Sequence, residues 1–518
     1  MSDREGRAEV RLTADLETAE ERVSDALDPD RKFIIVVLAD LQGSAGVDPR
    51  ATPMPLYQRR FFEVDRDNLD DAMKRLMVRW RGRLPGPEGD EAGASLELSF
   101  RGIEDFHPDS IVQRVPVLER LHRLLARLRD PEGMNEAEAE LKRWVPQAEV
   151  RREPPRAAAP EPPAAAATGI LESILEQTPP ASEPARRVDP ELQRFLREIV
   201  APHLVRVDSA RQGALRSAID GLLSLQVNAI LHDPAFQALE ASWRSLYWLV
   251  RNVETDSSLK IRAVHLRKEE VLRDVLSGKE LERSDLARLL LDPASVPGSD
   301  RPALLVGDYL FSPSLEDLAV LERFGNIGAR LGAPFLAGAS PGMVGRESFA
   351  GMEDPAEVRN FCRSAACEGW RLLRRSRAAR WLALAAPRLL CRLPYGRETD
   401  PAETFGYEEG IAGLRHGDLL WGNAAFAVAA AYAIGFAAQG WRMNLAAGVP
   451  SLHGFPLYQY REAGETVSQP CAEVLWPERM VEAVMEAGLL PVVSHRDTDA
   501  VSLPSLQTIA EPRSAIPL

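Results

Sequence analysis

A segment rich in Pro and Ala divides the chain and most constrains what it can fold into. Residues 151–169 read RREPPRAAAPEPPAAAATG, so almost no side chain that could build a core remains in this stretch. Such a composition favours an extended, semi-rigid tether. We therefore expect a linker at residues 146–168 with a folded part on each side. The length of 518 residues agrees, because it exceeds what a single hydrophobic core usually supports.

The charge and the cysteine content exclude several kinds of partner. The formal net charge is −14, which disfavours binding to nucleic acid or to an anionic membrane because both attract basic surfaces. The cysteines show neither paired spacing nor a nearby His, so we expect no metal site and no disulfide framework; they are Cys362, Cys367, Cys391 and Cys471. The first residues are charged throughout and lack the apolar core of a secretory signal, so we expect a cytoplasmic protein.

One uncharged stretch raises the question of a membrane span. Residues 421–441 read WGNAAFAVAAAYAIGFAAQGW, and about 20 apolar residues suffice to cross a bilayer. Nine of these residues are Ala, and Asn423 and Gln439 bring polar groups that lipid cannot satisfy. We therefore predict a helix packed on all sides by protein, without membrane insertion.

The part before the linker has the pattern of a small α/β module at residues 31–145, preceded by an N-terminal arm at 1–30. The apolar run at 31–40 predicts a buried strand, and the alternation at 94–100 predicts another. Residues 61–80 predict a short strand and then a helix that starts with acidic residues. A further helix is expected from Asp109 to residue 130.

The part after the linker predicts a larger α/β domain at residues 189–518 with a helical N-terminal stretch. An isolated helix at 169–178, GILESILEQT, precedes it and ends at Pro179. Helical periodicity extends over 189–252 and again over 314–332. Apolar strands between and after these helices indicate a parallel sheet; they are predicted at 259–266, 301–311 and 333–338.

A G-x-S-x-G sequence at residues 338–342 is the clearest candidate for catalysis. It follows a predicted strand, as a nucleophile elbow does, and Ser340 would be the nucleophile. The helix that should follow is interrupted by Gly342 and Gly345, which favours a tight turn instead. The histidines that could complete a hydrolase site are His416, His453 and His495. No phosphate-binding glycine motif occurs either, so we predict no catalytic and no cofactor-binding residues.

The segment Glu104-Asp105-Phe106-His107-Pro108-Asp109 places three carboxylates and an imidazole close together in the sequence. Such a group could hold a metal or transfer protons. Its position between a strand and a helix instead predicts a turn, with Asp109 as the helix cap beside Pro108.

A second charged group lies near Trp370. Arg371, Arg374 and Arg375 fall on one face of a predicted helix. In an acidic protein, such a face suits ion pairing with another acidic subunit or another copy of the chain. We therefore predict a basic assembly face.

Several segments after the linker resemble the large subunit of the type VI secretion contractile sheath. They are LQVNAILHDPAFQALEASWRSLYWLV (225–250), LLVGDYLF (304–311), APFLAGASPGMVG (333–345), APRLLCRLPYG (386–396), FGYEEG (405–410) and LLWGNAAFA (419–427). The part before the linker resembles the small subunit, through FFEVDRDNLDDAM, LELSFRGIEDFHPDSIVQRVPVLERL and, more weakly, FIIVVLADLQG.

The resemblance implies a structural protein rather than an enzyme. Small and large sheath subunits form a heterodimer that polymerises into a helical tube around stacked hexamers of an inner tube. Here both would be fused, with one-to-one stoichiometry. The chain stops at Leu518, whereas large subunits usually continue with strands that interlock neighbours. The expectation is therefore a self-assembling tube, ring or closed shell that does not contract. The alternative is an adaptor or regulator that binds sheath, baseplate or inner tube without polymerising.

The resemblance also implies two sets of contact residues. A helix at 116–128 would pack on the large-subunit part through Val117, Leu118, Leu121, Leu124, Leu125 and Leu128. The helix at 169–178 matches the site that an AAA+ unfoldase recognises in this family, through Leu171, Ile174, Leu175 and Thr178, with Glu172 and Gln177 on its polar side. A short amphipathic helix of this kind suits a groove on a partner.

Overall fold

The computed structural model describes residues 31–43, 54–84, 94–144, 209–292, 301–410, 414–445, 449, 451–462 and 465–518. The arm predicted at 1–30, the linker at 146–168 and the helix at 169–178 lie outside these residues. The chain divides into two compact units. The described residues of unit 1 fall within 31–84, 94–119 and 220–518, and those of unit 2 within 120–144 and 209–219.

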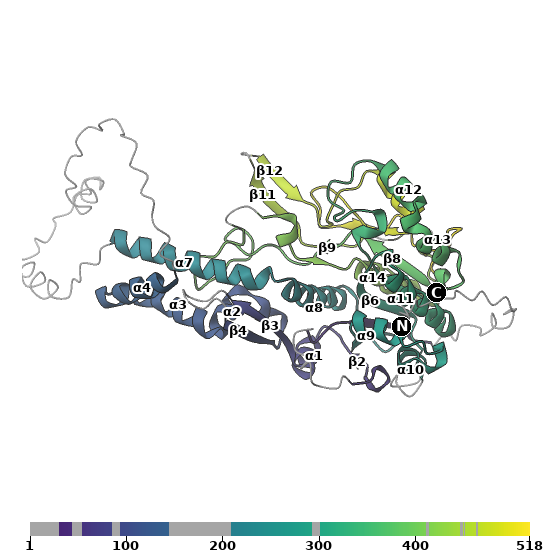
Figure 1. Ribbon diagram of the computed structural model, residues 1–518, viewed down its shortest axis with the longest axis horizontal. Coiled ribbons are helices and arrows are strands. Elements are labelled where there is room, and N and C mark those ends of the chain that lie inside the picture. The colour runs from purple at the N-terminus through teal and green to yellow at the C-terminus, as the bar shows by residue number, and fades with distance from the viewer. Residues whose placement is uncertain are drawn as a thin grey trace, which may run out of the picture. The chain divides into compact units, whose positions relative to one another are not determined.

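A seven-stranded sheet is the centre of unit 1 (Figure 1). Its order is β13 (Leu490–Pro491), β8 (Leu382–Ala386), β7 (Phe335–Ala339), β6 (Leu304–Phe311), β1 (Phe33–Ala39), β5 (Leu259–His265) and β2 (Phe62–Glu63). All neighbours are parallel except β2, which runs antiparallel to β5 at the edge. The predicted α/β class with a parallel sheet is thus confirmed, apart from this one antiparallel edge strand.

Strand β1 comes from before the linker, yet it lies inside a sheet built mostly from residues after it. It pairs with β5 from Phe33↔Leu259 to Ala39↔His265, and on its other side with β6 through residues 35–38. All seven residues of β1 are fully buried. A strand covered on both faces needs a continuous apolar sequence, which explains FIIVVLA.

Helices cover both faces of the sheet. Successive side chains of a strand point to opposite faces. Ile34, Val36 and Leu38 join a core with side chains of α9 (Lys268–Leu276), α10 (Asp285–Leu291) and α11 (Leu315–Leu331). On the other face, Phe33 stacks on Phe436 of α14 (Ala425–Gln439), with ring centroids 4.8 Å apart. Farther along, α12 (Pro355–Arg363), α13 (Glu368–Arg375) and α15 (Glu478–Glu486) extend the first of these cores.

Helix α14 forms the centre of the uncharged stretch at 421–441. Eleven of its 15 residues are buried, and it packs on α8 (Pro234–Asn252) and on strands of the sheet. The predicted helix surrounded by protein is therefore present. Among the residues that the structure describes, no helix is both long and apolar enough to cross a membrane.

Two helices before the linker end or break where the sequence prediction continued them. The helix expected to continue toward Trp80 ends as α1 (Leu69–Leu76), because Met77 adopts a left-handed φ of 52°. The next residues form β3 (Val78–Leu84), which pairs antiparallel with β4 (Ala94–Phe100). The helix expected from Asp109 is interrupted before Pro116, since proline removes an amide donor and disfavours helical backbone in the preceding residue. It forms α2 (Pro108–Arg114) and α3 (Pro116–Arg127).

Unit 2 contains the later part of α3, α4 (Pro131–Trp144) and the first turns of α7 (Ser209–Leu231). Arg211 of α7 forms an ion pair with Glu138 of α4 at 2.6 Å. Gln212 donates through Nε2 to the Leu128 carbonyl at 3.2 Å. Helices from before and after the linker therefore pack together within this unit.

Small two-stranded pairings complete the described structure. They are β9 (Leu389–Leu390) with β10 (Trp421–Gly422), β11 (Tyr458–Glu462) with β12 (Glu465–Gln469), and β14 (Val493–Ser494) with β15 (Val501–Ser502).

Candidate functional site

The residues before and after the linker meet in unit 1, and this contact region is the candidate functional site. We call it the junction. It includes the pairing of β1, the loop at residues 39–43 that follows β1, and the Arg59–Glu270 ion pair. It also includes the contact of the β3–β4 hairpin with the start of α8, and the contact of the start of α2 with a loop spanning residues 393–410.

The loop after β1 is held by two aromatic side chains from the other part of the chain. His265 accepts hydrogen bonds through Nδ1 from the amides of Leu41, at 3.1 Å, and Gln42, at 3.3 Å. Trp243 donates through Nε1 to the Leu41 carbonyl at 3.0 Å. Burial lowers the pKa of His265 to about 4. The ring is therefore neutral at pH 7, with Nδ1 as the acceptor nitrogen.

Asp40 lies beside this ring, 3.5 Å from His265 Nδ1, and accepts from the Gly43 amide at 3.0 Å. Burial raises the pKa of Asp40 to about 6. Gly43 has a φ of 86°, and a side chain there would also meet the Arg79 carbonyl, because a Cβ would lie 2.1 Å from its oxygen. Only glycine suits this position.

Arg59 and Glu270 form a two-pronged ion pair across the junction. Nη1 lies 2.9 Å from Oε2 and Nη2 lies 2.7 Å from Oε1, while Nη1 also donates to the His265 carbonyl. The side chains are 10% and 3% exposed. Burial alone would raise the pKa of Glu270, but hydrogen bonds from Arg59 and Arg267 outweigh it and lower the pKa to about 2.

An aromatic cluster joins the hairpin to α8. Phe100 stacks on Phe106 at 4.3 Å, and Phe236 of α8 meets both rings and Trp80 edge-on. Trp80 donates through Nε1 to Asp233 Oδ1 at 2.8 Å. The same oxygen caps α8 by accepting from the amides of Ala235 and Phe236, each at 3.0 Å. The Asp233 carboxylate thus caps the start of α8 and also holds Trp80 of the hairpin.

Asp109 connects α2 to the 393–410 loop. Its Oδ2 accepts from the Glu403 amide at 2.8 Å, and its Oδ1 accepts from the amide of Thr404, at 3.2 Å, and from its hydroxyl. The prediction that Asp109 caps its own helix is wrong. His107 is the cap, because its ring accepts from the Asp109 amide, and this leaves the Asp109 carboxylate available to the other part of the chain. The predicted turn is present as a 3₁₀ helix (Ile103–Phe106).

A buried ion network supports the loop that receives Asp109. Arg392 pairs with Glu240 at 2.9 Å and with Glu409 at 2.7 Å. Burial alone would raise the pKa of Glu409, but the Arg392 guanidinium outweighs it and lowers the pKa to about 2. Glu409 also accepts from the Tyr395 amide, and the Tyr395 ring packs edge-on against His107. The loop conformation is thus fixed from inside the core.

The G-x-S-x-G sequence forms the tight turn that was predicted. Strand β7 ends at Ala339, a 3₁₀ helix follows (Pro341–Val344), and Gly345 adopts a φ of 75°. The three candidate histidines each have a partner other than Ser340: His416 lies 3.3 Å from Glu473, His453 3.4 Å from Asp499 and His495 3.1 Å from Ser502.

The three arginines of the predicted basic face have different environments. Arg374 is 8% exposed and donates through Nε to the Ile509 carbonyl. Arg371 donates to the carbonyls of Cys362 and Ser364. Arg375 is the exposed member, 66% accessible in its pair with Glu511 at 3.5 Å. The three arginines therefore do not form one exposed face. An assembly role for Arg375 stays a prediction.

The predicted packing stripe of α3 is largely covered. Leu118, Leu121, Leu124 and Leu128 are buried, while Val117 and Leu125 are partly buried. The predicted unfoldase-binding residues at 171–178 lie outside the described residues. Sequence reasoning missed the Arg59–Glu270 pair, the role of His265 and the Trp80–Asp233 bond. Of these, only the Asp233-Pro234 start of α8 left a sequence signal, because Asp before Pro is a typical helix cap.

The junction defines a class of protein. One sheet shared by both parts, with polar groups largely paired between them, fits a structural protein whose two parts act as one block. Comparison with known families agrees. The VipB model, described as EvpB/VC_A0108, tail sheath N-terminal domain, matches residues 214–510. The VipA model, described as type VI secretion system, VipA, VC_A0107 or Hcp2, matches residues 4–152.

Two curated proteins of Pseudomonas aeruginosa are similar to the two parts. Type VI secretion system sheath protein TssC1 is 31% identical over 349 residues, which cover 65% of this chain and 70% of the relative. Sheath protein TssB1 is 29% identical over 119 residues, which cover 23% of this chain and 63% of that relative. The chain belongs to the type VI secretion sheath family and carries its VipA and VipB regions in one polypeptide.

Proposed function

We propose that this chain is a self-assembling structural subunit that forms a tube, ring or closed shell, and that both of its parts enter the assembly as one block. The observation that carries the proposal is the interior position of β1 between β5 and β6. A sheath-type subunit needs a rigid body whose faces keep fixed relative positions, and a strand shared by both regions provides one.

The apolar burial of β1 favours a permanent association of the two parts of the chain. Each fully buried large apolar side chain contributes about 1.5–3 kcal/mol before entropy is subtracted, and β1 has six such side chains besides Ala39. Removal of β1 would also leave the facing backbone groups of β5 and β6 unpaired. Within unit 2, the Arg211–Glu138 pair and the hydrogen bond from Gln212 to the Leu128 carbonyl add further contacts between residues before and after the linker.

The same proposal covers the remaining functional assignments. The chain acts without catalysis, in the cytoplasm, and its partners are other copies of itself, with inner-tube hexamers, baseplate components and an AAA+ unfoldase as further candidates. Family membership supports a structural role. The proposed unfoldase contact uses the helix at 169–178, and Arg375 is the proposed basic contact between copies.

Negative-stain electron microscopy of the purified chain tests the proposal. We expect regular tubes, rings or closed particles whose amount rises with protein concentration. A discrete monomer or dimer at all concentrations would overturn self-assembly and favour the adaptor function. Purification with and without an affinity tag that can be cleaved off provides the control, because a bulky terminal extension can block or induce association.

A further inference from the structure

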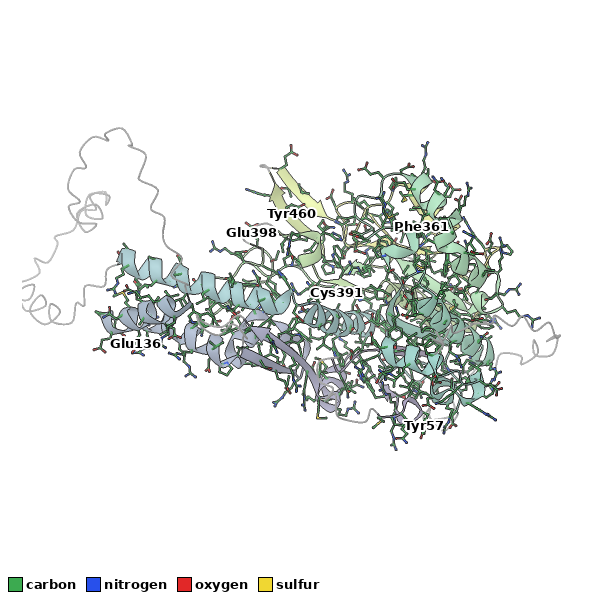
Figure 2. All side chains as sticks on the ribbon, in the orientation of Figure 1. Tyr57, Glu136, Phe361, Cys391, Glu398 and Tyr460 are labelled. Atoms are coloured by element: carbon green, nitrogen blue, oxygen red, sulfur yellow. The ribbon has the colours of Figure 1, made fainter. Side chains whose placement is uncertain are left out.

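A cavity of about 380 Å³ lies within unit 1, beside the end of α8. Its deeper wall is largely apolar and includes the buried residues Leu389, Leu390, Phe426 and Ala427. Arg251, Asn252 and Gly454 are the exposed residues among its lining and mark its mouth. Figure 2 labels Cys391, which also lines it. A volume of this size falls within the range of natural small-molecule pockets.

Helix α8 presents one face to this cavity. Arg244, Tyr247, Trp248 and Arg251 line it, and their spacing of three and four residues places them on the same side of a helix. No Asp or Glu is among the lining residues that the structure describes. Arg244 is neutralised by Glu240 at 2.7 Å, whereas Arg251 contacts the hydroxyl and ring of Tyr247 and has no carboxylate partner within the described part of the chain. The mouth of the cavity therefore carries a positive charge, although the chain as a whole is acidic.

The polar side chains deeper in the cavity already have partners. Ser245 Oγ lies 3.6 Å from Cys391 Sγ. Asn423 donates through Nδ2 to the carbonyls of Gly307 and Tyr309, each at 3.2 Å. Burial raises the pKa of Cys391 to about 12, so this thiol adds no negative charge at pH 7. The interior of the cavity therefore suits an apolar group.

Trp248 has an unused donor near the mouth. Its ring stacks on Phe455 with centroids 4.4 Å apart, which fixes the orientation of the indole. Its Nε1 is shielded from solvent and has no hydrogen-bond partner among the described residues, whereas buried polar groups usually have one. Gly454 lies beside this nitrogen, since a Cβ built on it would be 4.0 Å from Nε1. The missing side chain of Gly454 keeps this part of the mouth open.

One carboxylate lies near the mouth without lining the cavity. Asp499 accepts through Oδ2 from the Gly454 amide at 3.0 Å and lies 3.4 Å from His453 Nδ1. The hydrogen bond from the Gly454 amide, together with His453, lowers the pKa of Asp499. The Asp499 charge is thus directed to these two partners, and an anion at Arg251 would meet no acidic side chain in the described wall of the cavity.

These features match one class of ligand. A carboxylate would accept a charge-assisted hydrogen bond from the Arg251 guanidinium and a second hydrogen bond from Trp248 Nε1. An apolar body attached to it would be removed from water by the deeper wall. A nucleotide or polyphosphate matches less well, because the other lining arginine, Arg244, is already neutralised.

We propose that this cavity binds a small organic carboxylate with an aromatic or branched aliphatic body. The carboxylate lies at Arg251 and Trp248 Nε1, and the body lies against Leu389, Phe426 and Ala427. The cavity is lined only by residues after the linker, whereas the junction joins both parts of the chain. The inference therefore goes beyond the structural function proposed above and does not depend on it.

Fluorine NMR of the full-length protein with 4-(trifluoromethyl)benzoate tests the proposal. Binding to a large protein broadens the ¹⁹F line of a small ligand, and a titration gives the dissociation constant. We expect a dissociation constant of about 1 mM or below, as suits a ligand of this size. The matched ligand is 4-(trifluoromethyl)benzamide, which has the same ring without the charge and should bind at least about fivefold more weakly.

Variants of the lining residues test whether the benzoate binds in this cavity. Arg251→Met removes the charge at an exposed position and should weaken binding at least about fivefold, whereas Arg251→Lys should retain more of the affinity. Trp248→Phe keeps a ring that can stack on Phe455 but removes the donor, so a loss of about two- to fivefold is expected. Arg380→Met is the matched control, because Arg380 is exposed and does not line the cavity, and it should leave the dissociation constant unchanged.

Melting temperatures equal to that of the unaltered chain would exclude unfolding as the cause of any loss. The proposal would be overturned by the absence of line broadening with the benzoate at millimolar concentration. Equal binding of the benzamide and the benzoate would also overturn it, because the charge would then not be recognised. The same holds for an affinity that either Arg251→Met or Trp248→Phe leaves unchanged.

Discussion

Trp80 and Asp233 lie on opposite sides of the linker in sequence, and the indole Nε1 of Trp80 donates a 2.8 Å hydrogen bond to Oδ1 of Asp233. Because the same carboxylate caps α8, the VipA-like hairpin is attached to the first turn of a VipB-like helix. The junction therefore uses one side chain both to start a helix and to hold the other region in register.

Asp233→Ala should lower the free energy of unfolding by about 2–3 kcal/mol, since it removes a helix cap and a charge-assisted bond to Trp80 together. Asp354→Ala is the matched control, because the exposed Asp354 carboxylate caps α12 through the Ala356 amide, and should cost about 1 kcal/mol. Denaturant midpoints measured by circular dichroism compare the two. Equal losses would show that the Trp80 bond contributes nothing.

Asp109→Ala should destabilise the protein by about 1.5–3 kcal/mol, because three donors of Glu403 and Thr404 lose a charged acceptor at a partly buried site. Asp71→Ala also removes a carboxylate from the part before the linker, but this one is 70% exposed and its ion pair in the described structure is with the exposed Lys74, so a much smaller loss is expected. The same denaturant assay applies. A loss for Asp71→Ala as large as that for Asp109→Ala would contradict the assignment.

Cleavage of a protease site inserted within residues 146–168 should leave both parts together in size-exclusion chromatography at micromolar concentration. The reason is that β1 is fully buried between β5 and β6. A run in denaturing urea should separate two fragments and thus prove that cleavage was complete. Elution of two separate folded fragments under native conditions would mean that the junction is too weak to hold without the linker.

Arg59→Met should cost about 3 kcal/mol at pH 7, because Glu270 would keep a buried charge without its main partner. The pKa of Glu270 is lowered to about 2 in the folded protein, so its pairing stabilises the fold above pH 4.5 and the contribution is lost as the pH falls toward 2. The cost of Arg59→Met should therefore shrink at pH 3. The double variant Arg59→Met with Glu270→Gln should recover much of the loss at pH 7, and no recovery would argue against an unpaired charge as the cause.

Local patterns predicted most individual elements of the fold. The apolar runs predicted the bounds of β1, β5, β6 and β7 to within a few residues, and the uncharged stretch predicted the buried helix α14. The hairpin strand β3 was missed, although Val78, Trp80 and Leu84 are buried in an alternating pattern, because the preceding acidic helix extends its periodicity to Met77. The boundary depends on one left-handed residue, which sequence periodicity does not reveal.

The junction could not be predicted in the same way. The sequence FIIVVLA does not indicate that this strand pairs with residues 259–265 and 304–307. These parallel pairings join residues more than 200 positions apart in the chain. The same holds for Arg59 with Glu270 and for Asp109 with Thr404. Isolated charged residues in loops look alike in sequence, and only the tertiary fold decides which of them lose water and gain a partner.

The last prediction concerns Asp40 and His265, whose pKa values move in opposite directions at one contact. Burial lowers the pKa of His265 from 6.5 to about 4, so the unfolded chain binds more protons between these values and stability rises with pH. Burial raises the pKa of Asp40 from 3.8 to about 6, so the folded chain binds more protons and stability falls with pH. Arg267 and Glu270 face the same site, but the pKa of Arg267 is raised above its ordinary value and that of Glu270 is lowered to about 2, so neither group titrates in this range. The two slopes should therefore nearly cancel between pH 4 and 6.

Single variants should reveal how Asp40 and His265 each change the stability with pH. Asn at position 40 can still accept from Gly43, so Asp40→Asn should leave the His265 contribution, and stability should rise by about 1–2 kcal/mol more than in the unaltered chain from pH 4 to 6. His265→Asn offers an amide oxygen near the former Nδ1 position, and should leave the Asp40 contribution with the opposite sign. Denaturant midpoints of all three proteins across pH 4–6.5, each expressed relative to the unaltered chain, provide the measurement. Differences of the same sign for both variants would show that one of the two groups does not have the protonation state assigned to it.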